Sequence, residues 1–414
     1  TDKEHEDILE QADETDAMFG ELYSWYLRNP EYRRRVQKLV QSAYAGTPEE
    51  IISQSVATAL YGEVSPYSAT RLARFAACAF AHFLQYGMKL TERVEYEFKP
   101  MDTGNVMHEA LESFAEEVRK RGMKWTELTE QERNEIADRC LDNIVADYGN
   151  TVLKSSARNE YMIERTRRIL RRTVWALQKQ LEQGEFQPEG FEVTFGGGRI
   201  DRVDIMEDQN KVYVKVIDYK TGNTSFDLVY LYHGLQLQLM IYLDGALRVE
   251  QKKYPDKEII PAGVFYYNIK DPMIQEKIDA DVEAVSAGLM KELKMNGLVQ
   301  ADPELVYRMD SSLGSIPVAF NKDGSFRKNS SVADRTQFAV LGRYVRTKIE
   351  KIRNSILEGD AEVSPYELGK KNACTYCPYM TVCGFDRRLS GYEFRRLKNF
   401  SDEELWKAFD REAE

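Results

Sequence analysis

The sequence predicts an α/β protein in which helices flank a mixed central sheet. Three consecutive runs in the middle of the chain, 190–196, 198–206 and 211–219, are typical of strands, and a fourth covers 259–269. Stretches with helical spacing of their apolar residues come before and after these runs. Strands set among helices in this way indicate an α/β class.

The remaining elements follow from start and stop signals. Helices are expected over 1–60, with breaks at Asn29-Pro30 and Thr47-Pro48. The glycines at 196–198 fit a tight hairpin turn and not a phosphate loop, because no Lys-Ser/Thr follows them. A further helix is capped by 65–68, carries Cys78 and ends near Gly87, and the next one is opened by 102–104. Two helices lie within 126–184 and are split near Gly149. Helices are also expected over 227–250, 275–296 and 331–357, and from about 402 onwards.

Length and composition set wider limits. A chain of 414 residues exceeds the size at which single cores usually stop growing, so one elaborated domain with helical extensions and two domains both fit. No run approaches the roughly 18 apolar residues of a membrane span. The acidic N-terminus lacks both a signal peptide and an initiator Met, so we expect a cytoplasmic protein that is a piece of a longer chain.

Asp201, Asp218 and Lys220 are the most informative residues, because they belong to two neighbouring strand-like runs. Antiparallel strands would set the two carboxylates side by side, and side-chain alternation puts Asp218 and Lys220 on one face. Two bare carboxylates about 4 Å apart repel by roughly 4 kcal/mol at an effective dielectric near 20. Mg²⁺ removes that repulsion, so the pattern indicates a divalent cation with a polarised water. A surface ion pair at a strand end is the competing interpretation.

Four motifs surround these residues in order along the chain: Gly104-Asn-Val-Met-His108, Gly198-Arg-Ile-Asp201, Asp218-Tyr-Lys220 and Gln238-Leu-Met-Ile-Tyr242. In this order they resemble the motifs of the PD-(D/E)xK nuclease superfamily, and within it the RecB-like nucleases. The resemblance implies a restriction-endonuclease-like core and a metal-dependent nuclease. It further implies a Mg²⁺ or Mn²⁺ ion held by His108, Asp201, Asp218 and the carbonyl of Tyr219, a catalytic Lys220, and catalytic roles for Gln238 and Tyr242 near the DNA and the site.

Two of these assignments depend on the resemblance. A lone His on an amphipathic helix is usually packed or solvated, and only its spacing from Gly104 and its place before the sheet promote His108 to a ligand. Asp204 is a rival to Asp201, but strand alternation puts the two on opposite faces, and the family pattern selects Asp201.

The five cysteines give a second signal. Cys374, Cys377 and Cys383 form a tight group, and four-thiolate coordination needs a fourth ligand, which Cys78 or Cys140 could supply. An odd count without a secretion signal argues against disulfides. The resemblance selects Cys78, because nucleases with this lone-Cys-plus-triplet spacing bind a [4Fe–4S] cluster, and Zn²⁺ is the alternative metal. Such a cluster would fasten the C-terminal tail to the helix that opens the nuclease unit.

The resemblance narrows to AddB-type subunits of the bacterial AddAB helicase–nucleases. It rests on the segment 68–93, on the residues 232–238 and on the cysteine triplet, and it covers roughly 60–390. It implies a helical tail of a preceding helicase-like domain at 1–60, a nuclease domain closed by an iron–sulfur cluster at 61–395 and a C-terminal helix at 396–414. The chain has no Walker A motif, so this piece cannot be an ATP-driven motor.

In that family the nuclease trims the 5′-terminated strand of DNA that a helicase feeds to it during double-strand-break processing and recombinational repair. The resemblance therefore implies single-stranded DNA as substrate and an AddA-type helicase–nuclease subunit as heterodimer partner. Two other interpretations stay open. One is a stand-alone iron–sulfur exonuclease of the CRISPR-adaptation type, although these are shorter and lack the helical insert at 126–184. The other is a non-catalytic DNA-binding scaffold, which the intact Asp201, Asp218 and Lys220 argue against.

The net charge of −11 argues superficially against nucleic acid, but the distribution of charge matters more than its sum. Arginines cluster, notably over 165–172. Arg167, Arg168, Arg171 and Arg172 repeat at three- and four-residue spacing, so several share a helix face. We expect this face to contact DNA phosphates, and an ordinary solvated face is the alternative.

Overall fold

The structure is a computed structural model that describes residues 16–44, 51–62, 68–91, 100–147, 156–196, 198–274, 281–389 and 391–413. Several sequence-based expectations therefore lie outside the described residues. These are the helices expected at 1–15, the break at Thr47-Pro48, the first residues of the cap at 65–68, the split near Gly149, the central glycine of the 196–198 turn and the start of the helix expected over 275–296.

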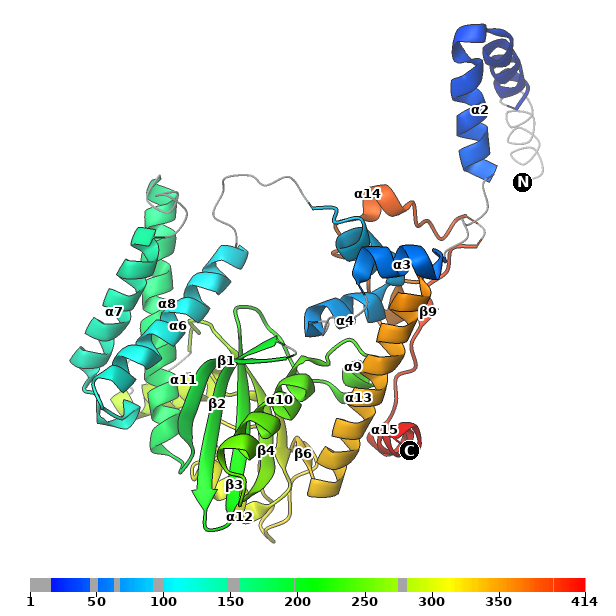
Figure 1. The fold of residues 1–414 in the computed structure, drawn as a ribbon. Helices are drawn as coiled ribbons and strands as arrows, with labels where there is room; N and C mark the ends of the chain where they lie inside the picture. The colour runs from blue at the N-terminus through cyan, green and yellow to red at the C-terminus, as the bar shows by residue number, and fades with distance from the viewer. Residues whose placement is uncertain are drawn as a thin grey trace, which may run out of the picture.

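A six-stranded mixed sheet forms the centre of the molecule (Figure 1). Its strands lie in chain order across the sheet, with β3–β4 and β5–β6 as the parallel pairs. The four predicted strands are confirmed within a few residues, and the expected hairpin is present because Phe195 pairs with Gly198. The strands are β1 (Gln187–Phe195), β2 (Gly198–Asp208), β3 (Lys211–Lys220), β4 (Glu258–Asn268), β5 (Asn296–Gln300) and β6 (Val332–Ala333).

Helices cover both faces of this sheet, as the α/β prediction requires (Figure 1). One face packs on α6 (Pro100–Lys120), α7 (Glu130–Asp147) and α8 (Ala157–Glu182), and the shared core includes Tyr219 and Tyr267. The other face packs on α4 (Ala69–Ala77), α10 (Gln238–Lys253) and α13 (Arg335–Glu358), with Val214 and Val264 in its core. The remaining helices of the body are α3 (Gln54–Tyr61), α5 (Ala79–His82), η1 (Phe83–Gly87), η2 (Trp125–Glu127), α9 (Leu228–Tyr232), α11 (Val282–Glu292) and α12 (Pro303–Met309).

Three predicted helices were wrong in their extent. The helix expected over 227–250 is two helices, α9 and α10, because Gly234 adopts φ +79 and turns the chain between them. The helix expected to carry Cys78 is broken at that residue, which is extended with φ −167 and ψ 119, while its predicted end near Gly87 is confirmed by η1. The helix expected over 275–296 ends too early: its described part, α11, stops at Glu292. The last predicted residue, Asn296, begins the strand β5.

The chain ends form smaller units around the body. The C-terminal part contains a three-stranded sheet of β7 (Tyr366–Leu368), β8 (Lys371–Asn372) and β9 (Arg395–Arg396), a short helix α14 (Met380–Cys383) and α15 (Asp402–Ala413), which packs against α13. Near the N-terminus, a helix over 16–28 and α2 (Pro30–Tyr44) lie side by side and stand apart from the body in Figure 1. None of the described helices combines the length and the apolar character that a membrane span needs.

Candidate active site

Three carboxylates from three neighbouring strands lie in one row across the sheet. Glu192 of β1 is opposite Asp201 of β2, which is opposite Asp218 of β3. Residues directly opposite each other in antiparallel strands normally face the same side of the sheet. The register follows from the pairs Phe191 with Arg202, Val193 with Ile200 and Arg202 with Ile217. The predicted pairing of Asp201 with Asp218 therefore holds, and the register adds Glu192 to it.

Helix α6 brings His108 onto this row. The Nδ1 atom of His108 lies 3.4 Å from Oδ2 of Asp201 and 3.8 Å from Oε1 of Glu192. One ligand atom from each of these three residues lies within 4.8 Å of the others, which is the spacing of groups that can share one metal ion. Four residues before His108, Gly104 lies next to Thr221, just after β3, where an added Cβ would be 3.4 Å from the Thr221 hydroxyl, an ordinary contact distance.

Glu192 has an unusual backbone conformation for a strand residue. Its φ is +49, in the left-handed region that residues other than Gly rarely adopt. Strained backbone of this kind often occurs at functional sites. Its side chain is almost fully buried and also contacts Arg199, so the carboxylate is held between one cation and His108.

Lys220, Gln238 and Tyr242 complete the site from the end of β3 and the first two turns of α10. Lys220 Nζ lies 2.7 Å from Oδ2 of Asp218 and donates to Oε1 of Gln238 at 2.9 Å. Gln238 Nε2 donates both to Oδ1 of Asp218 at 2.8 Å and to the hydroxyl of Tyr242 at 2.9 Å. The start of α10 at Gln238 places these two side chains one turn apart on the same face, next to the end of β3.

The electrostatics of this centre favour a bound cation. Burial raises the pKa of Asp218 to about 7, and repulsion from Asp201 adds to the rise, although the Lys220 ammonium opposes it. Burial alone would lower the pKa of His108, but hydrogen bonds to Asp201 and Glu192 outweigh it and raise the pKa to about 10. Without a metal, protons therefore offset part of the clustered negative charge. The Tyr219 N–H also donates to Oδ2 of Asp201 at 2.7 Å.

Asp204 lies on the opposite face of the sheet from Asp201. It is fully buried, with Arg202 at 2.6 Å and Lys215 at 3.1 Å. The two cations lower the pKa of Asp204 against the opposing effect of burial. The guanidinium of Arg202 also lies 5.7 Å from the ring centre of Trp125, so this ion cluster ties β2 and β3 to the helices on that face.

The structure brings Cys78 to the cysteine triplet. The four thiols line one cavity of about 20 Å³, and the extended backbone at Cys78 directs its side chain there instead of along a helix. The rest of the cavity is lined largely by apolar side chains. Burial and the three neighbouring thiols raise the pKa of Cys374 to about 12. All five cysteines are described, each is a free thiol, and Cys140 lies elsewhere, in the core between α6 and α7.

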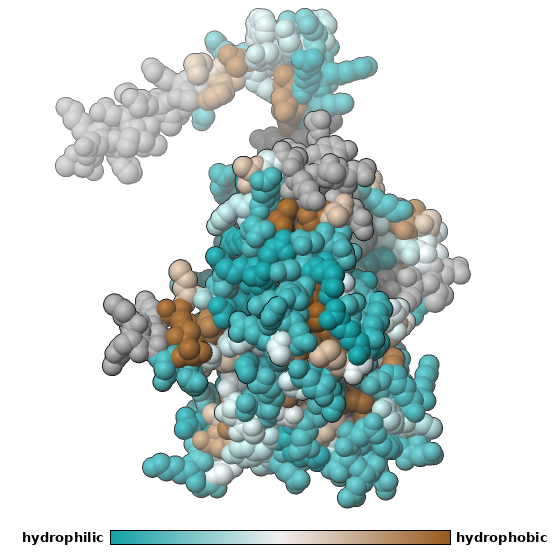
Figure 2. Space-filling model, turned by 90° about the vertical axis from the view of Figure 1, so that its left-hand side faces the viewer, coloured by the Kyte–Doolittle hydropathy of each residue, from teal (hydrophilic) through white to brown (hydrophobic). Residues whose placement is uncertain are grey.

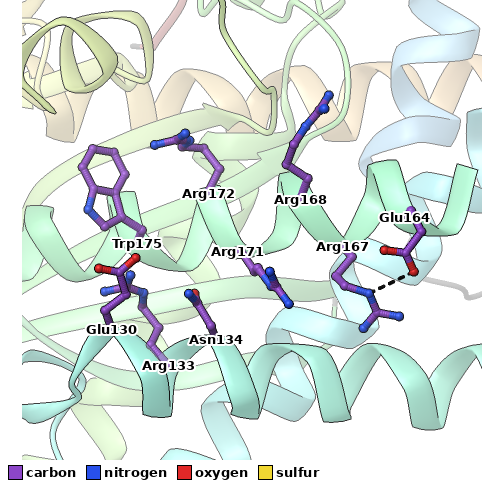
Figure 3. A pocket seen from close by; sticks show the side chains of 9 residues that line it. All are labelled: Glu130, Arg133, Asn134, Glu164, Arg167, Arg168, Arg171, Arg172 and Trp175. Atoms are coloured by element: carbon purple, nitrogen blue, oxygen red, sulfur yellow. Dashed lines mark hydrogen bonds and ion pairs between the residues drawn. The ribbon is translucent and has the colours of Figure 1, made fainter. Parts of the chain in front are cut away.

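The predicted phosphate-binding arginines on α8 fall into two sets that point in different directions (Figure 3). Arg167 and Arg171 point to α7, where both pair with Asp138. Arg168 and Arg172 point away from α7, and Arg168 pairs with Asp271 just after β4. All four line a cavity of about 490 Å³ that none of the predicted catalytic residues reaches. The face of the molecule on this side is mostly hydrophilic (Figure 2).

Comparison with known proteins connects this geometry to a family. Residues 66–384 match the PD-(D/E)XK nuclease superfamily, a range that contains the carboxylate row, Lys220 and all the cysteines. The chain belongs to the PD-(D/E)XK nuclease superfamily. The predicted restriction-endonuclease-like fold is thereby confirmed.

Curated relatives narrow the likeness to one kind of protein, the B-type subunit of an ATP-dependent helicase/deoxyribonuclease. The chain is 41% identical to that subunit from Lachnoclostridium phytofermentans, over 97% of this chain and 36% of that protein. It is 33% identical to the protein of the same name from Thermoanaerobacter sp. (strain X514), over 97% of this chain and 37% of that protein. The identity is also 33% to the one from Alkaliphilus metalliredigens, over 96% of this chain and 37% of that protein. The predicted resemblance to AddB-type subunits is confirmed, and the chain spans little more than a third of the length of these relatives.

Glu192 is the site residue that sequence reasoning missed. Its run was predicted as a strand, but the residue stands outside the four motifs. The available signal was the hairpin itself. A turn centred on the glycines at 196–198 pairs Phe195 with Gly198, and counting back three residues from Phe195 and forward three from Gly198 places Glu192 opposite Asp201.

Proposed function

We propose that this chain is a Mg²⁺- or Mn²⁺-dependent deoxyribonuclease. It hydrolyses phosphodiester bonds of single-stranded DNA, from the 5′-terminated strand, in double-strand-break processing and recombinational repair. The observation that carries this proposal is the pair Asp201 and Asp218 on the neighbouring antiparallel strands β2 and β3, with the Lys220 ammonium 2.7 Å from Asp218. Two carboxylates and a lysine at one sheet end form a site for phosphodiester hydrolysis with a hard divalent cation.

The donor set fits such a cation. Asp201, Asp218 and the carbonyl of Tyr219 supply oxygen, which Mg²⁺ and Mn²⁺ prefer, and His108 supplies nitrogen, which Mn²⁺ accepts more readily. The raised pKa of Asp218 supports this assignment, because the cost of a second negative charge beside Asp201 is the cost that a cation removes. When bound, the ion polarises a phosphate oxygen and lowers the pKa of a coordinated water. Glu192 is a further carboxylate within reach of the same ion.

The residues around the carboxylates have complementary roles in this proposal. Lys220 orients the attacking water and stabilises the negative charge that grows on the phosphate oxygens. Gln238 holds Lys220 through its carbonyl and Asp218 through its amide, so it fixes the distance between the two. Tyr242 fixes the orientation of the Gln238 amide by accepting its other hydrogen bond.

We propose that Cys78, Cys374, Cys377 and Cys383 hold a [4Fe–4S] cluster. Four thiols around one small apolar cavity fit a cofactor with four thiolate ligands. The chain between Cys78 and Cys374 contains nearly all of the proposed nuclease domain at 61–395, so the cluster closes that domain. Its role is to fasten the C-terminal segment to the region between α4 and α5.

The name of the relatives supports the proposed setting. It describes one subunit of a helicase/deoxyribonuclease, which favours a nuclease that works in a complex over a stand-alone exonuclease. We propose an AddA-type helicase–nuclease subunit as partner and the cytoplasm as location. Contact between DNA and the α8 arginines stays a prediction, with Arg168 and Arg172 as the pair that does not face α7.

Digestion of single-stranded DNA labelled at the 5′ or the 3′ end tests the proposal. The expected result is cleavage with Mg²⁺ or Mn²⁺, none with EDTA, and none for Asp218→Ala. The matched control is Asp256→Ala, which removes an exposed carboxylate from the turn before β4 and should cleave normally. Cleavage by folded Asp218→Ala, or cleavage in EDTA, would contradict the metal assignment, and the labels report the polarity.

A further inference from the structure

Two adjoining cavities follow the contact between α10 and α13. Two cavities of about 620 and 340 Å³ lie between these helices, and they share four lining residues, Met240, Asp244, Gly342 and Arg346. The cavities adjoin where Asp244 of α10 pairs with Arg346 of α13 at 2.9 Å, and we call the two together the α10–α13 groove. No predicted site residue lines it, so it is distinct from the metal centre.

The charge of this groove is opposite to that of the chain. Five basic and two acidic side chains line it, although the whole chain has a net charge of −11. Within the described residues, Lys252 and Arg343 have no ion-pair partner, whereas Arg248 and Arg346 both pair with Asp244, and Arg335 pairs with Glu258. The basic side chains are Arg248, Lys252, Arg335, Arg343 and Arg346. Such a strip of exposed cations fits a polyanion.

One end of the groove adjoins the active site. Phe195, at the end of β1, lines the groove, and its ring makes an edge contact with Tyr242 at 5.9 Å between ring centres. A Cβ at Gly245 would lie 2.6 Å from the Phe195 ring, so the glycine lets the hairpin press against α10 at this point. Tyr242 in turn is hydrogen-bonded to Gln238 beside Asp218. The Tyr242 ring and the Gln238 side chain therefore lie between this end of the groove and Asp218.

We propose that the α10–α13 groove carries single-stranded DNA next to the active site. This inference rests on the proposed nuclease function and adds the path of the substrate to it. Phosphates follow Lys252, Arg343 and their basic neighbours. Bases lie over the apolar floor that Met240 and Ile349 help to form, beside the Phe195 ring. Proteins that bind single strands without sequence preference combine a cationic track and an apolar or aromatic surface in this way.

The test measures DNA affinity against salt for the 414-residue chain, using a fluorescent oligothymidylate with EDTA present to prevent cleavage. Lys252→Gln/Arg343→Gln should lower the slope of log K against log salt by about 1.4, because each lost phosphate contact contributes roughly 0.7. When salt rises from 50 to 200 mM, the fold-loss of DNA affinity should then be about seven times smaller for this double variant than for the unmodified chain. Lys322→Gln/Lys328→Gln is the matched control, since it removes two exposed lysines that do not line the groove.

A second variant separates binding from folding. Gly342→Glu puts a carboxylate into the groove, where a Cβ would meet only the end of Arg346 at 3.7 Å. Replacing a helical glycine raises helix propensity, so this variant should fold at least as well and still bind DNA less tightly. If the unmodified chain binds and cleaves DNA but both groove variants behave as the control does, the α10–α13 groove is not the path. If the unmodified chain neither binds nor cleaves DNA, the proposed function itself fails.

Discussion

Replacing Asp218 with Asn should stabilise the metal-free protein at alkaline pH while it abolishes cleavage. Burial and the neighbouring Asp201 raise the pKa of Asp218 from 3.8 to about 7. Between these two values the folded protein keeps a proton that the unfolded chain releases. The metal-free fold therefore loses stability as the pH rises from about 4 to about 7. Asn cannot ionise, so the variant escapes this loss.

The size of the effect follows from the two pKa values. Each pH step between them corresponds to about 1.4 kcal/mol, so the loss reaches on the order of 4 kcal/mol above pH 7. The melting entropy of a 414-residue chain is about 0.9 kcal/mol/K, which converts this free energy to about 5 °C in Tm. Asn also retains an oxygen that can accept the hydrogen bond from Gln238, and what it loses is the ion pair with Lys220, whose side chain is partly exposed and also bonded to Gln238.

The assay is thermal unfolding in EDTA at pH 5, 6, 7 and 8, with Asp256→Asn as the control for an exposed carboxylate. The Tm difference between Asp218→Asn and the unmodified protein should grow up to about pH 7 and then stay constant. Added Mg²⁺ should raise the Tm of the unmodified protein and not that of the variant. A difference independent of pH, or a lower Tm for the variant at pH 8, would refute the reasoning.

Three further outcomes are expected. Lys220→Ala should bind Mn²⁺ with nearly unchanged affinity in calorimetry and lose turnover by about 100-fold or more, because the lysine stabilises charge and is not a ligand; equal loss of metal affinity would contradict this. Asp204→Ala leaves two buried cations without a counter-ion, so urea unfolding should show about 3–5 kcal/mol of destabilisation, against almost none for Asp256→Ala. Anaerobically prepared protein should be brown with about four irons per chain, retained in Cys140→Ser and lost in Cys78→Ser; a colourless protein with one zinc would favour the alternative metal.

The sequence by itself determined the local elements and the motifs that they carry. The strands β1 to β4 were predicted because alternation of apolar side chains is a property of a few adjacent residues. The same holds for Asp218 and Lys220, whose common face follows from the two-residue period of a strand, and for the tight spacing of the cysteine triplet. The family membership also depended on these local motifs.

Only the tertiary structure decided which distant groups meet. Glu192 joins Asp201 through the register of a hairpin, and Cys78 reaches the triplet because α4 ends one residue before it. Arg167 and Arg171 were expected on a phosphate-binding face, but they pair with Asp138 of α7. The periodicity of one helix shows which side chains share a face, not what that face contacts. The partner comes from a separate element, whose position is set by packing across the whole core.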